Sequence, residues 1–161
     1  MLEARYLTAR ELDADASRRL LAWLLEHGAD EFTVGVMALQ DEPARTADAF
    51  EDALAPFELP RAPRRVLGGA PDDDRTREVR RWALTAPSLA ALLPFLPDGP
   101  FAYAVGPAGW FEDLTVYRQG ELVLGVLTHE QEGVLRLTPA EHAEVRALGV
   151  TSAATGEWVA Y

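Results

Sequence analysis

Residues 109–138 read GWFEDLTVYRQGELVLGVLTHEQEGVLRLT, and this stretch decides the fold. Runs rich in Val, Leu, Thr and Tyr, residues that strands favour, are separated by two polar segments that each lead into a glycine. We expect Gly120 and Gly133 to adopt the left-handed backbone conformation that closes a three-residue hairpin loop with a bulge. The stretch therefore predicts a three-stranded antiparallel meander.

The middle run of this meander is apolar on both faces, with Leu122, Leu124 and Val126 on one side and Val123 and Leu127 on the other. A strand with one face in water alternates apolar and polar residues, so this run predicts a central strand that is covered on both sides. The next run turns one arginine outward and predicts a half-exposed neighbour.

Helices are predicted on both sides of the meander. After it, Thr138, Pro139 and Glu141 form a capping box with proline at the first helical position, and Gly149 is placed to end the helix. Apolar residues spaced three and four positions apart predict the other helices, which are 13–27, 46–57 and a short one that starts at Ala86.

Other segments are strand candidates. The pattern of residues 31–39 predicts a strand, and the tail 157–161 is a further candidate. Residues 75–85 have apolar spacing that also fits a helix, and a strand is favoured because the segment runs directly into the next helix start. For residues 1–12, a short strand and a capped helix start at Thr8 both stay open.

Together these elements predict an α+β fold: a single domain over residues 1–161, with a mostly antiparallel sheet built on the C-terminal meander and three to four packed helices. The sequence has no Cys, which excludes disulfides, thiolate metal sites and cysteine catalysis. It also lacks Lys, Asn and Ile, whose codons are A/T-rich, and this indicates a bacterial genome of high GC content.

The formal net charge is −11. Nucleic acids and anionic membranes are bound through positive surfaces, so we expect neither as a partner. No apolar run reaches the ~20 residues that cross a bilayer, and no signal-peptide pattern opens the chain, which favours a cytoplasmic location. The acidic balance fits plain solubility, and it also fits a basic protein partner.

The charge is unevenly spread along the chain. Residues 61–81 contain seven Arg against four acidic residues, so the remainder is strongly acidic. This arginine strip could be a docking face or a set of ion pairs within the fold, and the sequence leaves both open.

His129 and Glu130, where the central strand ends, are candidates for catalysis, with His142 in the following helix as a third. A His with nearby carboxylates can act as a general acid or base, or hold a metal if several ligands converge. The order of residues is not the H-E-x-x-H zinc motif, and no nucleophile elbow is present, so a polar strand end is the simpler interpretation. The sequence predicts no metal site and no cofactor.

The candidate binding site is the loop segment Trp110, Phe111, Glu112 and Asp113. Exposed aromatic residues can anchor a protein partner, and acidic residues can meet a cation. The alternative is a loop whose aromatic residues fold over the sheet edge. Three adjacent Asp in residues 68–74 are interpreted as a solvated turn rather than a Mg²⁺ or Ca²⁺ site.

The function expected from these patterns is binding of a protein partner through an acidic surface, without catalysis. In size and charge alone, the chain resembles the class of small immunity and antitoxin-type proteins. A small hydrolase or metal-dependent enzyme centred on His129 and Glu130 is one alternative. A homo-oligomeric structural protein that pairs through an exposed sheet edge is another.

Overall fold

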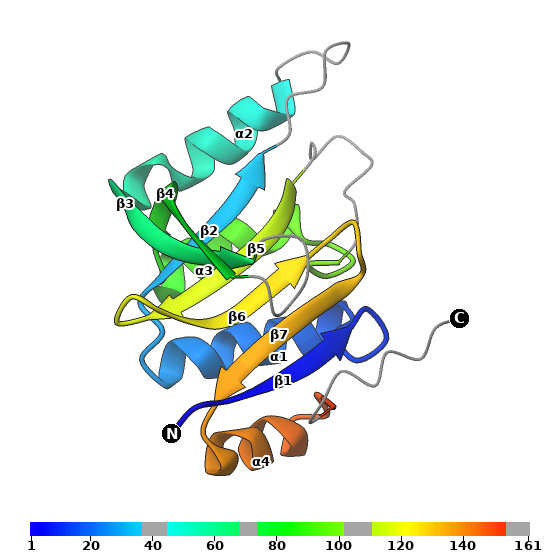
Figure 1. Cartoon of the computed structure of the whole chain (residues 1–161). Coiled ribbons are helices and arrows are strands. Elements are labelled where there is room, and N and C mark those ends of the chain that lie inside the picture. Colours follow the sequence, from blue (N-terminus) through cyan, green and yellow to red (C-terminus); the bar gives the residue numbers. More distant parts are fainter. Residues whose placement is uncertain (37–44, 68–73, 102–110, 154–161) are drawn as a thin grey trace.

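The computed structural model describes residues 1–36, 45–67, 74–101 and 111–153, which form an α+β fold (Figure 1). In this described part, one antiparallel sheet contains seven strands in the order β1-β7-β6-β5-β2-β4-β3, accompanied by four α-helices. The predicted fold class is confirmed. None of the described helices is long and apolar enough to cross a membrane.

The strands are β1 (Glu3–Thr8), β2 (Glu31–Val36), β3 (Glu58–Leu67), β4 (Asp74–Ala83), β5 (Phe111–Arg118), β6 (Glu121–Leu127) and β7 (Glu132–Leu137). The helices are α1 (Ala14–Glu26), α2 (Arg45–Leu54), α3 (Ala86–Leu92) and α4 (Pro139–Ala147). Short 3-10 turns, Ala55–Phe57 and Leu93–Phe95, follow α2 and α3. The tail 157–161, a predicted strand, lies outside the described residues.

The predicted meander is present as β5, β6 and β7, but its first turn closes differently from the prediction. Arg118 pairs with Glu121, so the loop consists of Gln119 (φ 54°) and Gly120 (φ 81°), both left-handed. Two left-handed residues are the mark of a type I′ turn, whose twist matches that of the flanking strands. The expected three-residue bulged loop was wrong at this position.

The second turn departs further from the prediction, because Gly133 lies within β7 and not in the loop. The left-handed residue is Gln131, with φ 59°. A Cβ on Gly133 would come within 2.8 Å of the carbonyl oxygen of Gly125 on the neighbouring strand. Glycine is therefore required here by close packing between strands rather than by turn geometry.

Burial along the meander follows the predicted pattern in most respects. In β6, every residue after Glu121 is buried, as expected for a strand covered on both sides. In β7, Arg136 is half-exposed, as predicted. Val134 on the same face of the strand is fully buried, so this face is less exposed than predicted. The capping box of Thr138 and Glu141 starts α4 as predicted.

The segments that the sequence left ambiguous are strands. Residues 1–12 contain β1, and 75–85 lies largely in β4. The sequence analysis ended a helix at residue 57 and assigned no strand to the residues that form β3, which include Pro60 and Pro63. β3 is an edge strand, where the N–H that proline lacks is not needed for pairing.

The main core lies between one face of the sheet and the side chains of α1, α2 and α3. At its centre the Trp82 ring lies 5.7 Å from the Phe32 ring and 5.6 Å from the Phe50 ring, measured between centroids. Aromatic pairs at these separations add attraction beyond that of buried area alone. All three side chains are almost completely buried.

The opposite face of the sheet is covered by the β3–β4 hairpin, which curls forward across β5 and toward β6 (Figure 1). Leu67 of β3 packs there against Tyr117, Leu122 and Val134. The hydroxyl of Tyr117 donates a hydrogen bond to the carbonyl oxygen of Arg65 at 2.8 Å. Burial raises the pKa of Tyr117 to about 12, so the phenol keeps the proton that it donates.

Ion pairs hold the base of this hairpin. The buried Glu31 of β2 accepts hydrogen bonds from Arg64 of β3, one of them at 2.9 Å, and from Arg81 of β4. Burial by itself would raise the pKa of Glu31, but the two guanidinium groups outweigh it and the pKa is lowered. Arg80 likewise donates to Glu58 at 2.7 Å and to Glu51 at 2.8 Å. These members of the arginine strip therefore form ion pairs within the fold.

Candidate functional site

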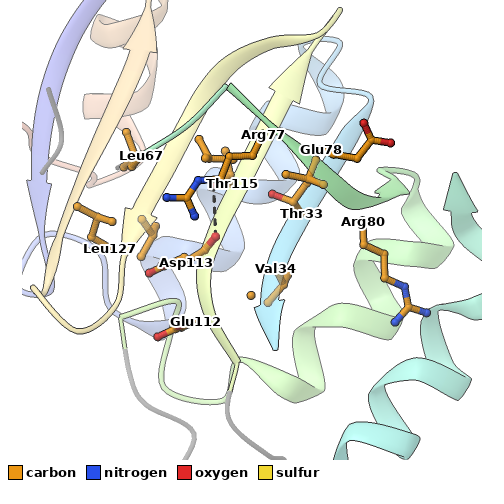
Figure 2. A pocket seen from close by; sticks show the side chains of 14 residues that line it. Thr33, Val34, Leu67, Arg77, Glu78, Arg80, Glu112, Asp113, Thr115 and Leu127 are labelled. Atoms are coloured by element: carbon orange, nitrogen blue, oxygen red, sulfur yellow. Dashed lines mark hydrogen bonds between the residues drawn. The ribbon is translucent and has the colours of Figure 1, made fainter. Parts of the chain in front are cut away.

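A pocket of about 340 Å³ lies between the curled β3–β4 hairpin and strands β2, β5 and β6 (Figure 2). Its apolar lining includes Val66 and Leu67 from the hairpin and Leu127 from β6. The volume is at the lower end of the range of ligand sites, which favours a small molecule as occupant.

Two carboxylates and one imidazole meet at one end of this pocket. Glu112 and Asp113 come from the start of β5, and His129 comes from the turn between β6 and β7. One ligand atom from each of these side chains lies within 4.8 Å of the others. We call these three residues the 112–113–129 group. Glu112 and Asp113 also line the pocket.

Backbone irregularity in β5 places the two carboxylates side by side. Thr33 pairs with Thr115 and Gly35 with Glu112, so two residues of β5 oppose one residue of β2 in a β-bulge. Within the bulge, Asp113 has φ 56°, a conformation that Asp tolerates better than most residues. A bulge redirects side chains, and in a regular strand the adjacent side chains would point to opposite faces.

Thr128 fixes the turn that carries His129 against β5. The backbone N–H of Asp113 donates to the Thr128 hydroxyl at 2.8 Å, and the N–H of Thr128 donates to Asp113 Oδ1 at 2.9 Å. The Thr128 hydroxyl in turn donates to the carbonyl oxygen of Pro100 at 3.2 Å. Thr128 is fully buried, so water does not compete for these bonds. His129 is thereby positioned beside the bulge.

The 112–113–129 group carries negative charge that the described residues do not neutralise. Burial raises the pKa of Glu112, the neighbouring charge of Asp113 raises it further, and His129 opposes the rise. No arginine of the described chain forms an ion pair with Glu112 or Asp113. A half-buried pair of carboxylates without a counter-ion attracts a cation.

The donor set suits a divalent metal ion. Carboxylate oxygen and imidazole nitrogen are both ligands of Zn²⁺, and three protein ligands leave further coordination positions for water or substrate. The Nε2 atom of His129 also lies 3.3 Å from Glu130 Oε1, so Glu130 is close to the histidine but outside the group. The 112–113–129 group could therefore hold a metal ion at this end of the pocket.

The sequence-based candidates are distributed between this site and other places. His129 and Glu130 are adjacent and half-exposed on the turn. His142 lies in the first turn of α4, beyond the other end of β7, and is buried with Nε2 3.0 Å from the carbonyl oxygen of Glu3. Burial lowers the pKa of His142, which favours the neutral ring. His129 and His142 therefore do not share a cleft.

The candidate binding segment is only partly described. Trp110 lies outside the described residues, and Phe111 is described as part of β5 without its side chain. Glu112 and Asp113, predicted to meet a cation, do face the pocket. Sequence reasoning placed them in a loop, whereas both belong to β5.

The sequence did not bring His129 together with Glu112 and Asp113, although the pairing of β5 with β6 contains the signal. A hairpin that closes at Gln119–Gly120 places the residues before β5's centre opposite the end of β6. The exact register required the turn type and a second irregularity between Val116 and Tyr117. Without these two facts, the acidic pair and the histidine remained separate candidates.

Comparison with protein-family models, curated proteins and solved structures finds no match to this chain.

Proposed function

We propose that this protein is a metal-binding protein that holds a divalent cation through Glu112, Asp113 and His129 at the end of the pocket. The observation that carries the proposal is the approach of their ligand atoms to within 4.8 Å of one another. Such an approach needs only small side-chain adjustments to reach the ~2.0–2.2 Å metal–ligand distances typical of Zn²⁺. The proposed role is binding rather than catalysis.

Electrostatics supports the same proposal. The pKa of Glu112 is raised by burial and by the charge of Asp113, so the surrounding protein disfavours the ionised form of Glu112. A bound cation reverses this balance by favouring both carboxylates in their charged form. Metal binding should also stabilise the fold by mass action.

The test is a titration of metal-free protein with Zn²⁺ by isothermal calorimetry. Wild type is expected to bind one equivalent, whereas Glu112→Gln and His129→Ala lower the affinity at least about tenfold, because each removes a ligand. Glu130→Gln is the matched control: it removes a carboxylate from the same turn, outside the 112–113–129 group. Loss of binding in this control alone would move the site to the His129–Glu130 pair, and an unchanged affinity in all variants would overturn the proposal.

A protein partner is a second candidate, supported by the absence of an arginine ion pair to Glu112 and Asp113 in the described chain. A basic side chain from another protein could supply the missing positive charge. This candidate predicts capture of a partner from lysate that weakens with salt and is lost in a Glu112→Gln, Asp113→Asn double variant. Capture that ignores either change would refute it.

A further inference from the structure

Two arginines line the pocket, and they differ in how they are held. Arg80 donates to Glu58 and Glu51, so its charge is neutralised within the fold. Arg77 is exposed, and its side chain has no hydrogen bond or ion pair within the described part of the chain. Figure 2 shows the Arg77 side chain on the same side of the pocket as Asp113. Among the residues that the structure describes, the Arg77 side chain is therefore a cation without an ion-pair partner, and it lies near Asp113 of the 112–113–129 group.

The charge balance of this end of the pocket depends on the metal. Without it, the carboxylates of Glu112 and Asp113 repel an anion and attract Arg77. With a divalent cation bound, the two carboxylates are neutralised and the charge of Arg77 is left over. The metal would also keep open coordination positions toward the pocket, because the protein supplies three ligands.

The apolar residues that line the rest of the pocket indicate what the uncharged part of a ligand would be. Val66, Leu67 and Val79 of the hairpin line the same space and are partly exposed. Val126 and Leu127 of β6 also line it, although both are buried. A short branched hydrocarbon fits this lining and the volume of about 340 Å³.

We propose that the metal-loaded pocket binds a small carboxylate with a short aliphatic body, its carboxylate held between the metal ion and Arg77. The proposal rests on the proposed metal site and adds the class of ligand to it. One carboxylate oxygen completes the metal's coordination, and the other accepts a charge-assisted hydrogen bond from Arg77. The aliphatic body lies on the valine and leucine side chains. Binding of the ligand and the metal is therefore cooperative.

The experiment is an NMR titration of the whole chain with isovalerate, with and without saturating Zn²⁺. The zinc-loaded protein is expected to show saturable shifts of the methyl groups of Val66, Leu67 and Val79, the partly exposed aliphatic residues of the hairpin that line the pocket. Isovaleramide, which has the same shape without the charge, should bind at least about tenfold more weakly. Arg77→Gln should weaken isovalerate binding by a similar factor and leave Zn²⁺ affinity unchanged. Arg61→Gln, an exposed β3 residue outside the pocket lining, should change neither.

The outcomes separate this proposal from the one on which it rests. If Zn²⁺ binds and isovalerate does not, the metal site stands and the ligand class is overturned. If isovalerate binds equally well to wild type and Arg77→Gln, or equally well without zinc, the arrangement between metal and Arg77 is overturned. If Zn²⁺ itself does not bind, the calorimetric titration shows this independently, and both proposals fall.

Discussion

The side chain of Leu67 on β3 lies directly over the backbone of Gly125 on β6, although these two strands are not neighbours in the sheet. A Cβ on Gly125 would come within 2.9 Å of Leu67 Cδ1. Because Gly125 has no side chain, Leu67 can pack directly on its backbone. This contact lets the β3–β4 hairpin lie close to the sheet. Leu67 also lines the pocket, and it packs against Tyr117, Leu122 and Val134 of the small core.

We expect Gly133→Ala to be more destabilising than Gly125→Ala, although both put a methyl group into the same sheet. At Gly133 the new Cβ meets a backbone oxygen at 2.8 Å, which cannot move without distorting β6. At Gly125 it meets the end of a flexible leucine. Expected losses of unfolding free energy are about 2–3 kcal/mol and about 1 kcal/mol, measured by urea unfolding.

A second substitution provides the control for this comparison. Leu67→Ala should relieve the clash at Gly125→Ala and leave that at Gly133→Ala unchanged, so only the first pair should be non-additive. Equal coupling in the two double variants would contradict the packing described for Leu67.

Glu31→Gln should destabilise the protein by about 2 kcal/mol in the same assay. The substitution keeps the size of the side chain but leaves Arg64 and Arg81 beside a neutral group in a largely buried place. Glu58→Gln also breaks an arginine pair, yet Glu58 is about one-third exposed, so its loss should be below about 1 kcal/mol. Equal losses of unfolding free energy in the two variants would show that burial does not strengthen the ion pairs of Glu31.

Protonation of Glu141 should lower the free energy of unfolding in acid. Its pKa is lowered to about 2 from 4.5, mainly by the hydrogen bond from Arg118 at 2.6 Å. Because the folded pKa is below the unfolded one, the stabilisation is complete above about pH 4.5 and is lost as the pH falls toward 2.

Glu141→Gln tests this pH dependence, since glutamine preserves the capping box and removes only the charge. Urea unfolding from pH 7 to pH 2.5 should show the variant less stable by about 1 kcal/mol at pH 7, with the difference shrinking in acid. A constant difference over the whole range would show that the charge of Glu141 is not the cause.

Local sequence signals predicted the elements that are stabilised locally. The capping box at Thr138 depends on residues three positions apart. The burial of both faces of β6 follows from a short run that has apolar residues on both faces. The predicted turn at Gly133 was wrong because glycine is used both for left-handed turn positions and for close packing between strands. Only the close approach of Gly125 on the neighbouring strand shows that Gly133 is a case of close packing. Patterns within one segment do not contain that information.

The candidate site could not be predicted from the sequence for a related reason. The 112–113–129 group depends on a bulge opposite β2, on a turn type and on the bonds of buried Thr128. The acidic pair and His129 were each recognised as candidates, and only the register of β5 with β6 unites them. The pocket itself depends on β3, an edge strand that was not predicted because its sequence contains two prolines.

The most direct test of the central claim is a crystal structure of the protein soaked in Zn²⁺, with diffraction data collected on both sides of the zinc absorption edge. The account predicts an anomalous peak at the end of the pocket, with Glu112, Asp113 and His129 at about 2.0–2.2 Å from the ion. A peak at a different set of side chains, or a site that stays empty at saturating Zn²⁺, would contradict it.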